Sequence, residues 1–354
     1  MRYRNDLLFS TVSEKNKNKS ITAVLSASQT DGMVLRDSLG IDIKFEEDSI
    51  KTYKVVRNGD YVIHLRSFQG GFAFSERIGV CSPAYTILRP NAALSYGFLR
   101  PYFMSDKFIN SLKLVTYGIR DGKSISVEEW LKLYTYVPEH MEQQKITSFL
   151  TLLDERIATQ NKIIEKLESL IKGLCSSLFD KNKYDSFVRL GDISEITNGN
   201  SDVQDASLSY RDGMYPFFDR SEDIKFLPEY LLDKEAIIYP GEGSEFYPRY
   251  YNGKFALHQR CYAIYDIAPN FATRYLYFFC KTQNSYFVRN AVGSTVASLR
   301  LDTFKRLNIP NIPIELQKTY VQLLDKIETK IVDNKIVLKK YEEQKRYLLS
   351  NLFI

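Results

Sequence analysis

A heptad pattern runs through residues 139–179 and sets a strong limit on how this chain can fold. Apolar residues recur there at alternating steps of four and three, which is the seam of a coiled coil. The seam positions are Ile146, Leu150, Leu153, Ile157, Gln160, Ile164, Leu167, Ile171, Leu174 and Leu178. At 1.5 Å per residue such a helix would be roughly 60 Å long, longer than one compact domain needs. We therefore expect it to pack against a partner helix.

The partner helix is found by adding 174 to each number. The second seam then consists of Tyr320, Leu324, Ile327, Ile331, Asn334, Leu338, Tyr341, Lys345, Leu348 and Leu352. The polar position of the first seam, Gln160, corresponds to Asn334. If the helices pack antiparallel, the two amides lie near the middle of both seams and can face each other, which would fix the register at a cost in stability. The alternative is that both amides point into solvent.

The same offset extends upstream of the helices, so the repeat is a repeat of whole domains. The segment KSISVEEW (residues 123–130) matches ASLRLDTF (residues 297–304), and each is followed by an apolar stretch that leads to Pro138 or Pro313. We predict globular domains at 1–138 and 181–314, and helices at 139–180 and 315–354. The expected fold class is α+β, with two similar mixed α/β domains separated by two long antiparallel coiled-coil helices in a pseudo-two-fold arrangement.

Cysteine usage and hydropathy bear on the cellular compartment. The four cysteines show no paired spacing, which is typical of a reducing environment. No apolar run approaches the roughly 18 residues of a membrane span, and the first residues lack a signal-peptide core. We expect a cytoplasmic protein that does not enter the membrane.

Net charge is modest in both globular domains and differs between them. The net charge is +5, with 19 basic against 14 acidic residues in 1–138 and 16 against 17 in 180–314. Neither domain is basic enough to hold nucleic acid through phosphate contacts alone. A DNA-binding role would therefore need help from a partner.

Signatures of catalysis are missing from the sequence. RDGKS at 120–124 is no phosphate-binding loop, because residue 117 is Tyr instead of the first Gly of that motif. His258 and Cys261 are spaced like two metal ligands, but no second pair is near them, which favours a structural role. The three histidines do not fall in the spacing of a catalytic triad, and the sequence contains no HExxH motif. We predict a chain with no catalytic residue, no metal and no cofactor of its own.

Three loops carry side chains suited to reading bases. Major-groove recognition uses Arg or Lys for guanine, Asn or Gln for adenine, Asp or Glu for cytosine and apolar contacts for thymine. The candidates are Arg66, Ser67, Phe68, Gln69 and Arg77 in the first domain, and Arg220, Ser221, Glu242, Ser244, Tyr247 and Arg249 in the second. The alternative is that these are ordinary solvated loop tips.

The order of these features resembles a known family. Two variable α/β domains, each followed by a helix that opens with text such as VPEHMEQQKITSFLTLLDERI and closes with LCSSLF or LLSNLF, are similar to the specificity (S, or HsdS) subunits of type I restriction-modification enzymes. The resemblance implies that each domain is a target-recognition domain reading half of a split DNA sequence, with the helices as spacer.

The resemblance also implies partners. Two methyltransferase (M) subunits would dock on this chain and methylate adenine with S-adenosylmethionine, and restriction (R) subunits that use ATP and Mg would join for cleavage. Two alternatives stay open. One is a coiled-coil scaffold that joins two protein-binding domains without touching DNA, and the other is a specificity subunit of a related restriction class.

Overall fold

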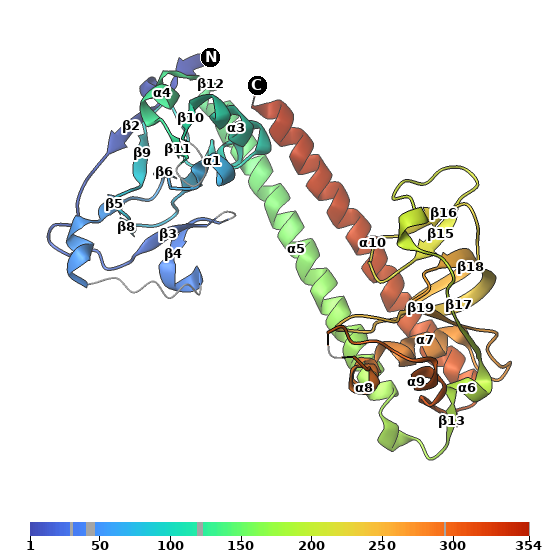
Figure 1. Cartoon of the computed structure of the whole chain (residues 1–354). Coiled ribbons are helices and arrows are strands. Elements are labelled where there is room, and N and C mark those ends of the chain that lie inside the picture. Colours follow the sequence, from blue (N-terminus) through green and yellow to red (C-terminus); the bar gives the residue numbers. More distant parts are fainter. Residues whose placement is uncertain (29–30, 40–46, 119–122, 294, 354) are drawn as a thin grey trace. The chain divides into compact units, whose positions relative to one another are not determined.

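The computed structural model describes residues 1–28, 31–39, 47–118, 123–293 and 295–353 (Figure 1). The chain divides into two compact units, Met1–Asn161 with Val337–Ile354, and Lys162–Ile336. Each unit holds one globular domain and parts of both long helices. Part of the RDGKS segment, residues 120–122, lies outside the described residues.

Two helices of 39 residues each run through the molecule, α5 at His140–Leu178 and α10 at Ile314–Leu352. Both ends of α10 follow those of α5 at an offset of 174, so the repeat fixes the helix bounds. All twenty seam positions are buried or partly buried, which confirms the heptad prediction. An ion pair joins the helices inside each unit, Lys345 to Asp154 at 2.5 Å in the first and Lys335 to Glu168 at 2.7 Å in the second. In both units the two helices run antiparallel (Figure 1).

The two amide residues of the seams belong to different units. Gln160 is buried in the first unit, and Asn334 is half-buried in the second, where its Nδ2 donates to the carbonyl of Lys330 at 2.6 Å. The facing of the two amides stays a prediction.

The first unit is built on a four-stranded antiparallel sheet in the order β2-β9-β6-β7. These strands are β2 (Phe9–Val12), β9 (Thr86–Pro90), β6 (Tyr61–Ile63) and β7 (Ala73–Phe74). Two-stranded pairs surround it: β1 (Arg2–Arg4) with β12 (Tyr134–Tyr136), β3 (Leu25–Ser28) with β4 (Gly32–Leu35), β5 (Lys54–Val56) with β8 (Gly79–Cys81), and β10 (Thr116–Tyr117) with β11 (Ser124–Ile125). Its short helices are α1 (Ser67–Gly70), α2 (Arg100–Phe103), α3 (Asp106–Ser111) and α4 (Val127–Lys132).

The second unit repeats this frame and extends it. Its six-stranded sheet has the order β14-β19-β17-β18-β15-β16. The strands are β14 (Glu195–Asn198), β19 (Cys261–Tyr265), β17 (Leu232–Pro240), β18 (Arg249–Leu257), β15 (Tyr215–Phe218) and β16 (Lys225–Leu227). β13 (Phe187–Arg189) pairs with β20 (Asn308–Pro310), and the helices are α6 (Leu190–Ile193), α7 (Thr273–Lys281), α8 (Asn284–Asn290) and α9 (Leu301–Lys305).

The first four strands of the larger sheet correspond one by one to the sheet of the first unit. The β13–β20 pair corresponds to β1–β12, and α9 corresponds to α4 at the offset of 174. Both of these short helices bury one large aromatic side chain, Trp130 in α4 and Phe304 in α9. The mixed α/β prediction is therefore confirmed, and among the described residues β15–β16 has no counterpart in the four-stranded sheet of the first unit.

A buried glutamine fastens the start of α5 to the first globular domain. Gln143 is 1% exposed. Its Nε2 donates to the carbonyls of Ala93 and Pro138, both at 2.9 Å, and its Oε1 accepts from the Ser95 backbone N at 2.7 Å. One side chain thus holds both the chain entering the helix and a loop distant in sequence.

The second unit uses the equivalent glutamine in the same way. Gln317 is fully buried. Its Nε2 donates to the carbonyls of Asn270 at 3.0 Å and Ile312 at 2.9 Å, and its Oε1 accepts from the Ala272 backbone N at 2.9 Å. The sequence signal for both joints was the Glu-x-Gln or Glu-Gln-Gln text after the proline, although the hydrogen bonds themselves could not be foreseen.

The far end of each helix packs on the other globular domain. Phe353, after α10, stacks on Tyr102 with ring centroids 5.1 Å apart and lies 5.4 Å from Phe98 in the first unit. Phe179, after α5, contacts Tyr275 at 5.5 Å and Phe279 at 5.6 Å in the second. Each domain therefore holds the start of one helix and the end of the other.

We predict that Gln317→Leu will destabilise the second unit. The substitution keeps the volume but leaves three backbone groups without their partner, which should cost about 3 kcal/mol of unfolding free energy. Thermal unfolding, followed by circular dichroism, measures the change. The exposed neighbour Lys318, changed to Ala, is the matched control and should unfold as the wild type does, because its partner is the exposed Glu315. Equal stability of Gln317→Leu and wild type would contradict the assigned role.

Candidate nucleic-acid interface

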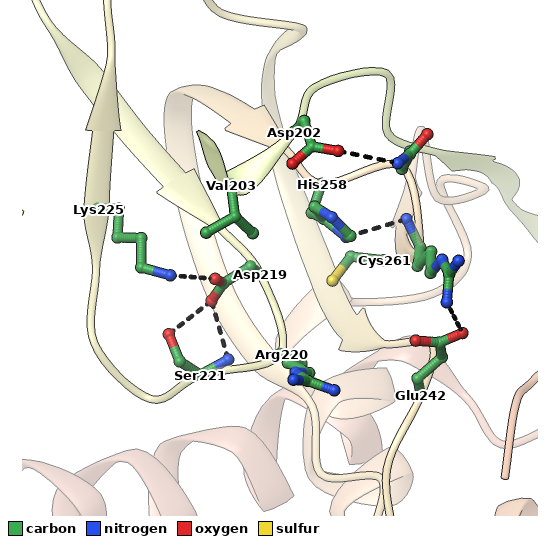
Figure 2. Close-up of a pocket in the computed structure, with 11 residues that line it drawn as sticks. Asp202, Val203, Asp219, Arg220, Ser221, Lys225, Glu242, His258 and Cys261 are labelled. Carbon is green, nitrogen blue, oxygen red and sulfur yellow. Dashed lines mark hydrogen bonds and ion pairs between the residues drawn. The ribbon is translucent and has the colours of Figure 1, made fainter. Parts of the chain in front are cut away.

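The second unit carries a concave pocket of about 550 Å³, lined mostly by polar and charged residues (Figure 2). It opens where the loop after β15 faces the turn between β18 and β19. Its lining residues are Asp202, Val203, Asp219, Arg220, Ser221, Lys225, Glu242, His258, Gln259, Arg260 and Cys261. Acidic, basic, amide and hydroxyl side chains alternate around it, which suits a ligand surface with both donors and acceptors.

Asp219, at the end of β15, organises one wall of the pocket. Its carboxylate accepts hydrogen bonds from the Ser221 backbone N at 2.8 Å, from the Ser221 Oγ at 2.6 Å and from the Lys225 Nζ (Figure 2). Burial pushes the pKa of Asp219 upward, but the Lys225 ammonium and the Ser221 donors outweigh it and lower the pKa overall. The carboxylate therefore stays ionised at neutral pH and fixes the loop.

Arg249, at the start of β18, supports this wall from behind. Its guanidinium donates to the carbonyl of Ser221 at 2.8 Å and to that of Asp219, and it lies 5.1 Å from the Phe218 ring centroid. Burial lowers its pKa. These contacts hold the loop in place, and a contact of the partly exposed Arg249 with bases stays a prediction.

The facing wall is the turn His258–Cys261. Its two tip side chains are exposed, and each is held by a carboxylate: Arg260 Nη1 donates to Glu242 Oε1 at 2.5 Å, and Gln259 Nε2 donates to Asp202 Oδ2 at 3.2 Å. Neither Gln259 nor Arg260 is among the residues that the sequence predicted to read bases. The sequence does contain a signal for them, because two residue types that read bases in the major groove stand in the short link between two strands.

The other candidates of the second unit divide by exposure. Arg220 is exposed at the pocket and makes no hydrogen bond or ion pair with another described residue. Ser221 is half-buried and engaged with Asp219. Ser244 and Tyr247 are exposed but lie outside the pocket lining. The structure therefore brings together Arg220, Ser221 and Glu242, and adds the tip of the turn.

In the first unit, four candidates lie in or directly before the short helix α1, and Arg77 lies between β7 and β8. Arg66, Gln69 and Arg77 are exposed and Phe68 is half-buried. Ser67 is 0% exposed, and its Oγ accepts from the His64 backbone N at 2.8 Å. Ser67 therefore stabilises the loop from within and cannot reach a base, which corrects that prediction. The remaining candidates are accessible and stay predictions.

Neither a metal site nor a membrane-spanning helix is found among the described residues. Among the described residues, no three His, Cys, Asp or Glu side chains gather as a metal site would require. The His258 Nδ1 accepts from the Arg260 backbone N at 3.2 Å, and Cys261 is buried. Over the same described ranges, no helix combines the length and apolar character needed to cross a membrane.

The chain is similar to known proteins in part of its sequence and in its fold. Residues 183–340 match the family model described as type I restriction modification DNA specificity domain. The chain is also similar to the solved type I restriction-modification S subunit of M. genitalium, at 14% identity and a TM-score of 0.66 over 100% of this chain and 96% of that one. No curated protein sequence matches.

Two further solved structures share the fold. The HsdS subunit of Thermoanaerobacter tengcongensis is 14% identical, with a TM-score of 0.50 over 100% of this chain and 96% of that chain. A chain from a structure on complex assembly and conformational transition of the type I R-M system is 16% identical, with a TM-score of 0.58 over 99% and 96%. At these identities the likeness shows the fold alone, over the full length.

The matched residues 183–340 cover most of the second globular domain and the greater part of α10. The family match thus covers residues 183–340, and over its full length the chain shares the fold of solved type I restriction-modification S subunits.

We predict that Arg249→Met will loosen the wall of the pocket. Two loop carbonyls lose their donor, which should lower the unfolding free energy by about 2 kcal/mol. Arg220→Ala is the matched control, because that side chain is exposed and its loss should leave stability unchanged. Urea unfolding of both variants measures the difference. Equal stability of the two would show that Arg249 does not support the loop.

Proposed function

We propose that the two globular domains each read one half of a split DNA target. The observation that carries this proposal is the shared frame: four strands in the same order in both units, joined to the helices by equivalent glutamines, with different residues in the loops. A common frame with unlike loops is what two independent readers require, since a rigid scaffold positions the side chains and the loops choose the bases.

The proposed division of the chain follows the sequence. Residues 1–138 and 181–314 are the target-recognition domains, and residues 139–180 and 315–354 are the spacer helices. The first domain presents Arg66 and Gln69 at α1 and Arg77 between β7 and β8, and the second presents the polar pocket. Because neither domain is strongly basic, partners that close around the DNA would supply further phosphate contacts.

The two long helices repeat a pattern of exposed apolar residues, which suits the docking of two copies of one partner. On α5, Phe149, Ile163 and Leu170 are exposed apolar residues spaced in multiples of seven, on the flank of the seam. At the offset of 174, Leu323 and Val337 on α10 are exposed as well, with 44% and 38% of their surface accessible. Unpaired apolar side chains at equivalent helix positions favour docking of two like subunits. We assign these positions to the two methyltransferase subunits.

The chemistry is assigned to the partners. The methyltransferase subunits would use S-adenosylmethionine to methylate adenine, and the restriction subunits would use ATP and Mg for translocation and cleavage. The present chain contributes base recognition and the docking surface. Reading chromosomal DNA places this work in the cytoplasm.

The function is tested by sequencing methylated bases in a host with and without the gene. We expect a methylated motif of two short half-sites separated by unread base pairs, present only with the gene. Replacing residues 242–248, with Arg249 kept as the loop support, should change one half-site and leave the other intact. Arg66→Ala together with Gln69→Ala should change only the other half. A change in both halves from either replacement would contradict independent readers.

The docking assignment has its own test. Phe149→Glu and Leu323→Glu place a charge at equivalent helix positions, so each should remove one copy of the methyltransferase subunit, and the double variant should remove both. Native mass spectrometry of the purified assembly counts the copies. Leu208→Glu, on an exposed loop of the second domain, is the control and should retain two. Two copies bound to the double variant would rule out this surface.

A further inference from the structure

The turn between β18 and β19 is fixed by its backbone to an unusual degree for an exposed link. The Cys261 N donates to the His258 carbonyl at 2.8 Å, which closes a β-turn with Gln259 and Arg260 at its tip. The His258 N donates to the Phe218 carbonyl at 2.9 Å, and the Gln259 N donates to the Ser201 carbonyl at 3.0 Å. Neighbouring segments therefore hold the turn from outside as well as from within.

Two glycines allow this close approach. A Cβ at residue 199 would overlap the carbonyl oxygens of Leu257 and His258, and one at residue 241 would overlap the carbonyl oxygen of Arg260. Gly199 and Gly241 thus let two other chain segments lie directly against the turn. The tip cannot shift without moving both, so its two side chains start from a defined position.

The side chains at the tip are oriented by carboxylates. The Glu242 side chain is 18% exposed and the Arg260 side chain is 62% exposed, so the pair is anchored at its acidic end while the guanidinium reaches outward. Ser298 Oγ also donates to Glu242, at 3.4 Å. Asp202 holds Gln259 through one hydrogen of Nε2. Each carboxylate occupies a single donor, which leaves most of the guanidinium and the outer half of the amide available.

We propose that Arg260 reads a guanine and Gln259 a neighbouring adenine in the half-site of the second domain, with Glu242 and Asp202 as their positioning residues. The inference rests on the proposed function and names the groups that carry it out. A guanidinium can donate two hydrogen bonds to guanine O6 and N7, and a glutamine amide can pair in the same way with adenine N6 and N7.

The arrangement argues against an ordinary solvated turn. An exposed ion pair contributes little to stability, so nothing in folding requires both tip residues to be held by carboxylates. The link to the equivalent strand of the first unit, Ser82–Tyr85, has the sequence SPAY and offers neither a guanidinium nor a side-chain amide. The fixed tip of the turn thus belongs to the second domain and not to the strands that both domains share.

This assignment gives Glu242 a role other than base contact. Its carboxylate was a candidate acceptor for a cytosine amino group, but in the structure it accepts from Arg260 and Ser298. Its negative charge is thereby neutralised beside the DNA surface. Arg220, exposed across the pocket, is left as the group suited to a phosphate.

The test uses the assembly of this chain with its methyltransferase subunits and a random-sequence duplex library. Bound duplexes are selected and sequenced for the wild type, Arg260→Lys, Glu242→Gln and Gln259→Ala. Arg260→Lys keeps the charge but loses the paired donors, so discrimination at one guanine should fall about tenfold or more, with other positions unchanged. Gln259→Ala should relax discrimination at one position only, that of the adjacent adenine.

Glu242→Gln separates positioning from stability. It should relax the same guanine as Arg260→Lys, to a smaller extent, with the salt dependence of binding unchanged, an effect that a purely structural role would not produce. Arg306→Lys is the matched control, because Arg306 forms an exposed ion pair with Asp302 at 2.5 Å on α9, away from the pocket. It should leave every position as in the wild type.

The outcomes distinguish this inference from the proposed function. If the wild-type assembly selects no split sequence, the proposed function fails. If it selects one and Arg260→Lys selects the same one with equal discrimination, the inference fails while the function stands. Uniform weakening at all positions would make Arg260 a phosphate contact, and a change in the half-site of the first domain would also overturn the assignment.

Discussion

The architecture depends on two buried amides. Gln143 and Gln317 each satisfy three backbone groups that would otherwise be buried without a partner, at the place where a globular domain becomes a long helix. Such groups are costly to leave unpaired, so the helix can start only where the domain presents those two carbonyls and one N–H. A single residue type thereby fixes the direction in which each helix leaves its domain.

The helix ends complete what the amides begin. Since Phe353 and Phe179 fill aromatic sites in the domains opposite to their own starting points, neither helix can slide along the other without emptying one of these sites. Apolar seams alone tolerate shifts by whole heptads, whereas aromatic anchors at the ends do not. Charged pairs along the seam then add a smaller preference for the same alignment.

The parts of this structure that follow a period were accessible from the sequence. The seam positions, the helix bounds and the correspondence of α4 with α9 all follow from the heptads and the offset of 174, because packing imposes a regular spacing on apolar residues. The common sheet was predicted only as a class, since strand order depends on contacts between distant segments. Residues 1–138 and 181–314 share too little loop text for their equivalent strands to be paired by eye.

The candidate site was harder to predict, for a specific reason. Arginine is the preferred reader of guanine and also the preferred clamp for carbonyl groups, and residue type does not tell the two apart. Arg249 is a clamp, Arg260 is exposed at a tip, and only the positions of Asp219 and Glu242 reveal the difference. Ser67 illustrates the same limit, because a hydroxyl on a loop can as easily cap its own backbone.

The two units differ in the number of chain segments that form them, and this difference matters during synthesis. The second is one continuous segment, Lys162–Ile336, whereas the first needs the final stretch from Val337 onward. At roughly 5–20 residues per second, a ribosome takes on the order of ten seconds or more to add the missing segment after the first domain has emerged. Throughout that interval the aromatic site for Phe353 stands open, so the domain made first is the last to be finished.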